Sequence, residues 1–133
     1  MATLLRSLTL CLALALTLTA CGGDGESGTV PEVANTTVAA AVESAKAEGA
    51  AVIDVRTPEE YAEGHVEGAT NIDVQATDFD DRVAELDRDT TYVVYCRSGN
   101  RSAAAAERMR EAGLTVVDGG SLEDMAAAGY PVG

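Results

Sequence analysis

The stretch VVYCRSGNRSAAAAERM, residues 93–109, joins a predicted strand to a predicted helix. Its first residues are β-branched and aromatic, which favours a buried strand, and its alanine-rich second half favours a helix. Between the two lies a short polar loop that runs from Cys96 to Arg101. A strand that turns into a helix in this way directs several backbone N–H groups and a helix N-terminus toward one point. The stretch therefore predicts an anion-binding loop with a cysteine at its start.

The rest of the chain, from about residue 36, alternates between helix and strand signals. Predicted helices have capping residues at Thr36 or Thr37, Thr57, Asp78 and Ser121, and Ser102 lies near the start of another. Short apolar runs between them predict strands at 51–56, 68–74, 90–96 and 114–118. Short strands alternating with helices favour a three-layer α/β fold, with a mostly parallel sheet of about five strands and helices on both faces.

Two strand ends in this predicted sheet carry polar or ionisable residues that could take part in binding or catalysis. One is Asp54-Val55-Arg56, and the other begins at Cys96. Ligand sites in open α/β sheets lie at the carboxyl ends of the strands. We therefore expect both groups to lie at one edge of the sheet.

Cys96 is the candidate nucleophile. A helix N-terminus and nearby cations, here Arg97 and Arg101, lower the pKa of a cysteine, and Gly99 permits the turn that the loop requires. The same groups could hold the oxygens of a sulfonate or a phosphate. The alternative is a buried structural cysteine, which is the common state of a free thiol.

The first 36 residues predict export and anchoring rather than part of the fold. Residues 1–20 have one basic residue and an apolar run too short to span a bilayer, which is typical of a signal peptide. They end in LTA before Cys21, which resembles the lipobox of bacterial lipoproteins. The resemblance implies a lipid anchor on Cys21 in the cell envelope, whereas an ordinary signal peptide or an apolar helix is the alternative. Residues 21–36 then predict a flexible linker and 37–133 the folded domain.

The charge of the chain excludes some partners. The formal net charge is −13, and nucleic acid or an anionic membrane surface requires a basic face. A small anionic substrate remains possible, because a local site can be positive on an acidic protein.

Three segments of the chain together resemble the rhodaneses, the thiosulfate sulfurtransferases. They are YCRSGNRS at 95–102, DVRTPEEYAEGHVEGATNI at 54–72 and GGSLEDMAAAGYPV at 119–132. The resemblance covers most of the domain and implies a rhodanese-like fold. One departure is Met125, which stands where the family often has tryptophan.

The resemblance implies that Cys96 takes a sulfur from thiosulfate, holds it as a persulfide and passes it to cyanide or a thiol. It implies no cofactor. The loop residues that would bind substrate or stabilise the sulfur are Arg97, Ser98, Gly99, Asn100 and Arg101. We expect Arg97 to contact the sulfonate and Arg101 to hold the shape of the loop. Asp54, Arg56 and Ser102 would support the loop.

Alternatives to an enzyme of this kind share the fold but differ in chemistry. A persulfide carrier or sensor would use the same loop with a protein partner, and an inactive binding module would not need Cys96. Phosphatases and arsenate reductases on related folds use C-x5-R, one residue longer than the C-x4-R of Cys96 to Arg101. His65 is expected to fix a turn rather than act as a base, no metal-ligand cluster is recognisable, and we expect a monomer.

Overall fold

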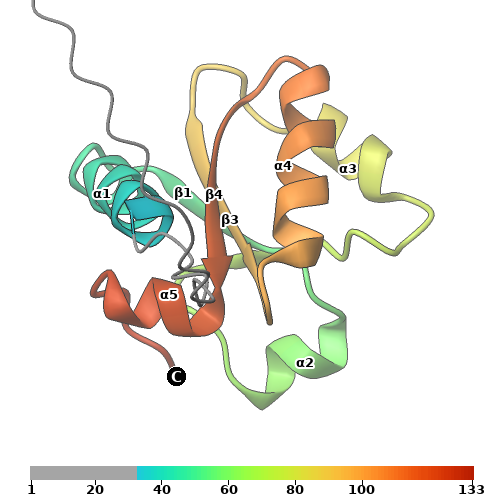
Figure 1. Cartoon of the computed structure of the whole chain (residues 1–133). Coiled ribbons are helices and arrows are strands. Elements are labelled where there is room, and N and C mark those ends of the chain that lie inside the picture. The colour runs from blue at the N-terminus through green and yellow to red at the C-terminus, as the bar shows by residue number, and fades with distance from the viewer. Residues whose placement is uncertain (1–32) are drawn as a thin grey trace, which may run out of the picture.

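The computed structural model describes residues 33–133, with side chains from residue 38 (Figure 1). The predicted signal peptide, the lipid site Cys21 and most of the predicted linker lie outside the described residues. Helix α1 (Val33–Ala47) begins before the predicted caps Thr36 and Thr37, so the last residues of the predicted linker are helical. No glycine or proline interrupts residues 33–37, and nothing local therefore stops the helix at the predicted cap.

The sheet has parallel strands in the order β2-β1-β3-β4. The strands are β1 (Ala51–Asp54), β2 (Thr70–Asn71), β3 (Thr91–Cys96) and β4 (Thr115–Ser121). Within residues 33–133 the structure has these four strands, where about five were expected. A single antiparallel bridge between Val66 and Val132 adds a further pairing outside the sheet.

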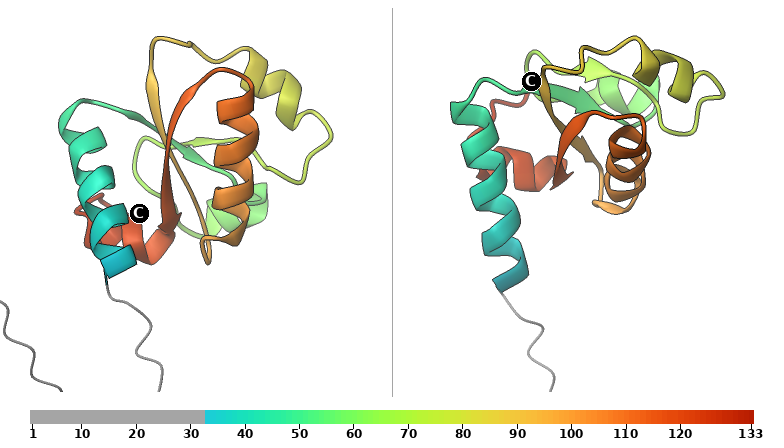
Figure 2. Two further views of the ribbon diagram at one scale, coloured as in Figure 1. Left: turned by 45° about the horizontal axis from the view of Figure 1, so that its top comes forward. Right: turned by 90° about the horizontal axis from the view of Figure 1, so that it is seen from above.

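Helices cover both faces of this sheet, which confirms the predicted three layers (Figure 2). Helices α3 (Phe79–Ala84) and α4 (Asn100–Glu111) pack on one face, over a core that includes Phe79, Val94 and Met109. Helices α1 and α5 (Leu122–Ala127) pack on the other, over a second core that includes Val93 and Tyr95. Because successive residues of a strand point to opposite faces, Cys96 belongs to the α3/α4 side and Tyr95 to the α1/α5 side.

Two short helices begin as their sequences predict. In α2 (Pro58–Glu63), Thr57 accepts a hydrogen bond from the Glu60 backbone, and the Glu60 side chain accepts one from the Thr57 backbone. Ser121 and Asp124 form the same capping box at the start of α5. Asp78 is the N-cap of α3 but its side chain makes no capping hydrogen bond. None of the helices within residues 33–133 is long and apolar enough to cross a bilayer.

Candidate active site

The predicted loop lies at the carboxyl edge of the sheet, between β3 and α4. Cys96 is the last residue of β3 and is fully buried, while Arg97, Ser98 and Asn100 are exposed. Gly99 is the N-cap of α4 and adopts a φ of 88°, a left-handed conformation that favours glycine. The chain therefore turns sharply around the cysteine, as the sequence predicts.

Several backbone N–H groups of the loop and of the start of α4 act on the sulfur of Cys96. The Gly99 N–H donates to Sγ over 3.1 Å. Burial by itself raises the pKa of the Cys96 thiol, but hydrogen bonds from the backbones of Ser102, Ser98 and Gly99 outweigh it. The Ser102 hydroxyl acts in the same direction. The net shift of the Cys96 pKa is downward, so the loop favours the nucleophilic thiolate.

Ser102 ties the loop to the neighbouring strand. It is fully buried, and its Oγ lies 2.9 Å from the Gly99 carbonyl and 3.2 Å from the Gly120 carbonyl at the end of β4. The peptide that follows Gly99, next to the one that donates to Cys96, is thus linked through Ser102 to the end of β4. The support that the sequence predicts for Ser102 has a direct geometric basis here.

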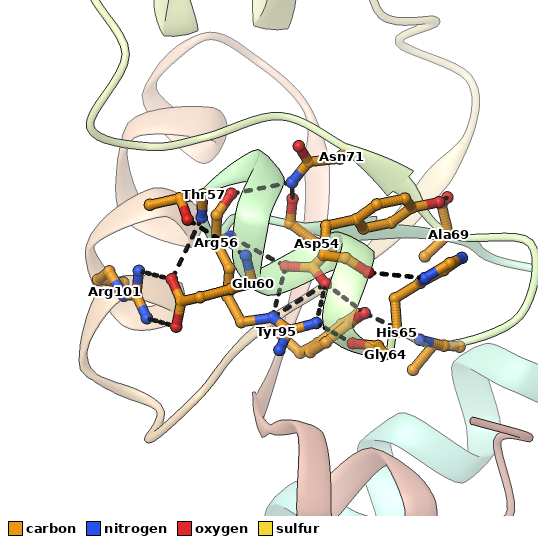
Figure 3. Close-up of polar contacts among 12 residues, drawn as sticks. Asp54, Arg56, Thr57, Glu60, Gly64, His65, Ala69, Asn71, Tyr95 and Arg101 are labelled. Atoms are coloured by element: carbon orange, nitrogen blue, oxygen red, sulfur yellow. Dashed lines mark hydrogen bonds and ion pairs between the residues drawn. The ribbon is translucent and has the colours of Figure 1, made fainter. Parts of the chain in front are cut away.

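Arg101 is held by a residue that sequence reasoning did not assign to the site. Its guanidinium donates to both carboxylate oxygens of Glu60, at 2.7 and 2.8 Å (Figure 3). The hydrogen bond from Arg101 is the main reason that the pKa of Glu60 falls to about 2, despite partial burial. Glu60 lies 41 residues from Arg101 in the chain, and only the fold brings the two together. Its local sequence signal, an acid in the first turn of α2, indicated only helix capping.

Asp54 and Arg56 form a buried ion pair, and the Tyr95 hydroxyl donates a hydrogen bond to Asp54 (Figure 3). Asp54 accepts from Arg56 Nη2 and from the Tyr95 hydroxyl, both at 2.6 Å, and Arg56 Nη2 also donates to the Gly64 carbonyl at 2.7 Å. Burial is the largest cause, and Asp54 the next, of a raised pKa for Tyr95. Asp54 and Arg56 form hydrogen bonds to these groups rather than to residues 97–101. Tyr95, the residue before Cys96, is the contact between this pair and strand β3.

A hollow of about 370 Å³ opens beside the loop. The residues that line it are Arg56, Glu60, Glu63, Gly64, Arg97, Leu122 and Val132. Arg97 lines this space, and Arg101 does not but pairs with Glu60. Met125 does not line the hollow, because its side chain is buried beneath Gly119, where an added Cβ would lie 2.6 Å from its sulfur.

His65 has the turn-fixing contacts that the sequence predicts. Its ring stacks on Tyr61 with centroids 3.7 Å apart, and its Nδ1 lies 2.9 Å from the Tyr61 carbonyl. Its backbone exchanges two hydrogen bonds with Gly133. Within the described part of the chain, no group of three or more His, Cys, Asp or Glu side chains could hold a metal ion.

The lowered pKa of Cys96 predicts a shifted pH profile of alkylation. A thiol with a depressed pKa stays ionised, and reactive, at pH values where an ordinary thiol of pKa about 8.5 is protonated. As the pH is lowered, we expect the rate of Cys96 alkylation by neutral iodoacetamide to reach half its maximum at a pH below about 8.5, the pKa of an ordinary thiol. Mass spectrometry of the peptide that contains Cys96 measures this rate. A midpoint at or above that of free cysteine would contradict the thiolate-stabilising role of the loop.

The chain matches one protein family over most of its folded part. A model of the Rhodanese-like domain matches residues 37–126. A thiosulfate sulfurtransferase, PspE of Escherichia coli, is 41% identical over 75 residues, which are 56% of this chain and 72% of that protein. The thiosulfate sulfurtransferase GlpE of Pseudomonas putida is 40% identical over 83 residues, or 60% of this chain and 74% of that one.

Solved structures agree with the sequence matches. A rhodanese with anions from E. coli has a TM-score of 0.53 and 36% identity, and the match covers 62% of this chain and 95% of that one. A rhodanese-related protein of Thermoplasma volcanium has a TM-score of 0.60 and 35% identity, covering 71% of this chain and 93% of that one. The α/β fold described above is the fold of these proteins.

Proposed function

Because this chain belongs to the rhodanese family of sulfurtransferases, we propose that it transfers a sulfane sulfur through a persulfide on Cys96. The donor would be thiosulfate or another persulfide, and the acceptor cyanide or a thiol. The observation that carries the proposal is the environment of Cys96, whose sulfur receives the Gly99 N–H and whose pKa is lowered by the loop. No cofactor enters the proposed cycle.

The proposed cycle has two displacements. The Cys96 thiolate attacks the outer sulfur of thiosulfate, the sulfur–sulfur bond breaks, and sulfite leaves with the electron pair. The acceptor then attacks the outer sulfur of the Cys96 persulfide. That bond breaks in turn, so thiocyanate or a new persulfide leaves and the Cys96 thiolate returns. Because the thiolate is favoured beforehand, no separate general base is needed. The loop N–H groups would stabilise the negative sulfur at both stages.

Intact mass of the purified full chain, before and after thiosulfate, tests this cycle. We expect a gain of one sulfur atom at Cys96, its removal by cyanide, and release of thiocyanate. A folded protein with reduced Cys96 that gains no sulfur from thiosulfate would contradict thiosulfate as the donor. Failure with alkyl persulfides as well would contradict the sulfurtransferase function itself.

Arg97 is proposed to bind the sulfonate end of the donor. It lines the hollow and makes no ion pair within the described residues, whereas Arg101 is engaged by Glu60. A charge-assisted hydrogen bond contributes about 1.5–3 kcal/mol, and solvent exposure reduces it. The groups that lower the pKa of Cys96 are backbone and Ser102 hydrogen bonds and not Arg97, contrary to the sequence expectation. We therefore expect Arg97→Ala to raise the KM for thiosulfate about tenfold while the rate of iodoacetamide alkylation stays unchanged.

The matched control is Arg88→Ala. Arg88 is also an exposed arginine, but it precedes β3 at the opposite edge of the sheet. Arg88→Ala removes the same charge as Arg97→Ala, and we expect no change in the KM for thiosulfate. A KM for thiosulfate that is the same in Arg97→Ala and in the wild type would exclude Arg97 as the sulfonate-binding residue.

Export to the cell envelope with a lipid on Cys21 is also proposed. Its support is the sequence of residues 1–21, namely the apolar run and the small residues before the cysteine. The mass of the mature N-terminus in cells tests it, together with Cys21→Ser. A protein that keeps residues 1–20 and carries no lipid would contradict the proposal.

A further inference from the structure

Helix α2 has no buried residue, so polar contacts rather than a buried apolar face attach it to the domain. Tyr61 donates to the Ala69 carbonyl at 2.7 Å, and Glu60 accepts from the Arg101 guanidinium at 2.7 and 2.8 Å (Figure 3). Within residues 33–133, the Glu60–Arg101 pair is the only hydrogen-bonded or ionic link between α2 and the segment from Cys96 to the end of α4. One side chain of α2 therefore fastens this helix to the loop.

The position of Arg101 does not serve the stability of its own helix. Arg101 is the second residue of α4, where the helix dipole disfavours a positive charge. Glu60 compensates this charge from another element, and its hydrogen bond is the largest cause of a raised pKa for Arg101. The same hydrogen bond lowers the pKa of Glu60 to about 2. The pair therefore stays charged across the whole pH range in which a thiol titrates.

The donors that stabilise a negative sulfur lie on both sides of Arg101 in the chain. Burial acts to raise the pKa of Cys96, and hydrogen bonds from the backbones of Ser102, Ser98 and Gly99 reverse this effect. Hydrogen bonds weaken when their geometry is distorted, so a displacement of residues 98–102 leaves the effect of burial less opposed. Whatever fixes Arg101 therefore also fixes the groups that favour the thiolate.

We propose that Glu60 is a positioning residue for Cys96, which acts through Arg101 by holding the loop donors in the geometry that stabilises the thiolate. The other charged groups that act on the pair are Arg56, which acts on Glu60, and Asp73, which acts on Arg101. The inference rests on the proposed function in one respect, because it takes Cys96 as the reacting group.

Position and charge predict opposite shifts when the Glu60 carboxylate is removed. If Glu60 acted by its charge alone, its loss would leave the guanidinium of Arg101 unopposed. This guanidinium interacts with the charge of Cys96, so the pKa of Cys96 would fall. If Glu60 acts by position, its loss loosens the donors, and burial then raises the pKa of Cys96. The direction of the shift therefore separates the two roles.

Glu60→Gln tests the inference and keeps the start of α2 intact. Glutamine at this position still completes a capping box with Thr57. Its NH2 group donates and cannot accept from a guanidinium, so the two-point contact with Arg101 is lost. The rate of Cys96 alkylation by iodoacetamide is measured against pH in the full chain, from the mass of the peptide that contains Cys96.

We expect the pH of half-maximal alkylation to rise in Glu60→Gln, so that the rate below this midpoint falls about tenfold. A tenfold loss is the size of one weak charge-assisted hydrogen bond to the thiolate. The rate at high pH, where the thiol is ionised in both proteins, should not fall, because a thiolate of higher pKa is the stronger nucleophile. A midpoint that is unchanged or lower in Glu60→Gln would overturn the inference.

Two matched controls separate the pair from general effects on the helices. Asp80→Asn removes the carboxylate that pairs at 2.7 Å with Arg108, which lies in the last turn of α4, away from the loop. Thr57→Ala removes the side-chain cap of α2 and leaves the Glu60–Arg101 pair in place. We expect neither substitution to shift the midpoint. The same shift in either control would overturn the inference, because the loss of any ion pair on α4, or of α2 stability, would then be sufficient.

A double-mutant cycle shows whether Glu60 acts through Arg101. In an Arg101→Gln background, we expect Glu60→Gln to cause no further shift of the midpoint, and additive shifts would contradict the proposed route. Arg101→Lys keeps the charge but breaks the two-point contact from the other side. It should raise the midpoint as well, which tests the inference even if Glu60→Gln does not fold. Circular dichroism of each variant checks the fold.

Alkylation needs no sulfur donor, and this separates the inference from the proposed function. A wild-type protein that gains no sulfur from thiosulfate or alkyl persulfides, while Glu60→Gln shifts the alkylation midpoint upward, would refute the proposed function and support the positioning role. Uptake of sulfur by Cys96 without a shift in Glu60→Gln would refute the inference alone.

Discussion

Replacing Cys96 with serine is expected to reduce sulfur transfer from thiosulfate to cyanide to the uncatalysed background, a loss of more than about a thousandfold. A serine hydroxyl can occupy the position of the sulfur and accept the Gly99 N–H. It is not ionised by this loop and forms no persulfide, so the first displacement has no nucleophile. Thiocyanate release and the mass of the peptide that contains residue 96, each measured after addition of thiosulfate, check the result.

Two further measurements on Cys96→Ser show whether sulfur is gained at another cysteine and whether the fold is kept. In protein that retains residues 1–21, Cys11 and Cys21 are the other two cysteines, so a sulfur gained by Cys96→Ser can be assigned to one of them by peptide mass. Circular dichroism should show the wild-type fold, because the substitution changes one atom in a buried site. Thiocyanate formation at the wild-type rate by Cys96→Ser would contradict a persulfide on Cys96.

The second large effect is expected from the buried ion pair. Asp54→Asn leaves the guanidinium of Arg56 buried without its counter-charge, although Tyr95 and the Gly64 carbonyl remain nearby. Breaking one side of a buried pair costs about 3–5 kcal/mol. Since small domains have a free energy of unfolding of about 5–15 kcal/mol, the variant should lose a large part of its stability. Urea unfolding followed by circular dichroism measures this change.

The matched control for that variant is Asp80→Asn. Asp80 pairs with Arg108 at the same kind of distance, 2.7 Å, but both side chains are exposed to solvent. Exposed pairs contribute about 0–1 kcal/mol, so we expect only a small change in the free energy of unfolding. Equal effects of the two substitutions would show that the burial of the Asp54–Arg56 pair has no energetic consequence.

Much of the fold is predictable from local sequence. The capping residues Thr57 and Ser121 begin their helices as expected, and the β-branched run before Cys96 forms a buried parallel strand. These signals are local, since a capping box or a strand pattern acts within a few residues. The start of α1 was predicted too late, because a β-branched threonine is compatible with a helix interior as well as with a cap.

Local sequence likewise predicts one part of the candidate site and not the other. The loop from Cys96 to Arg101 is contiguous in sequence, and its turn, its glycine and its helix N-terminus could be inferred there. Glu60 could not be inferred, because its role depends on a contact with a residue 41 positions away.

The sequence by itself determined the order of the elements, the position of the nucleophile and the cations beside it. The tertiary structure decided which of those cations is available. The sequence predicts different roles for Arg97 and Arg101, but only the fold shows the partner of Arg101, because Glu60 of α2 pairs with Arg101 while Arg97 lines the hollow. The opposite orientation of the Tyr95 and Cys96 side chains follows from alternation along β3, whereas only the pairing of β1 with β3 brings Asp54 to Tyr95. Charges compensate one another through space, so their pairing follows from how the layers pack and not from their spacing along the chain.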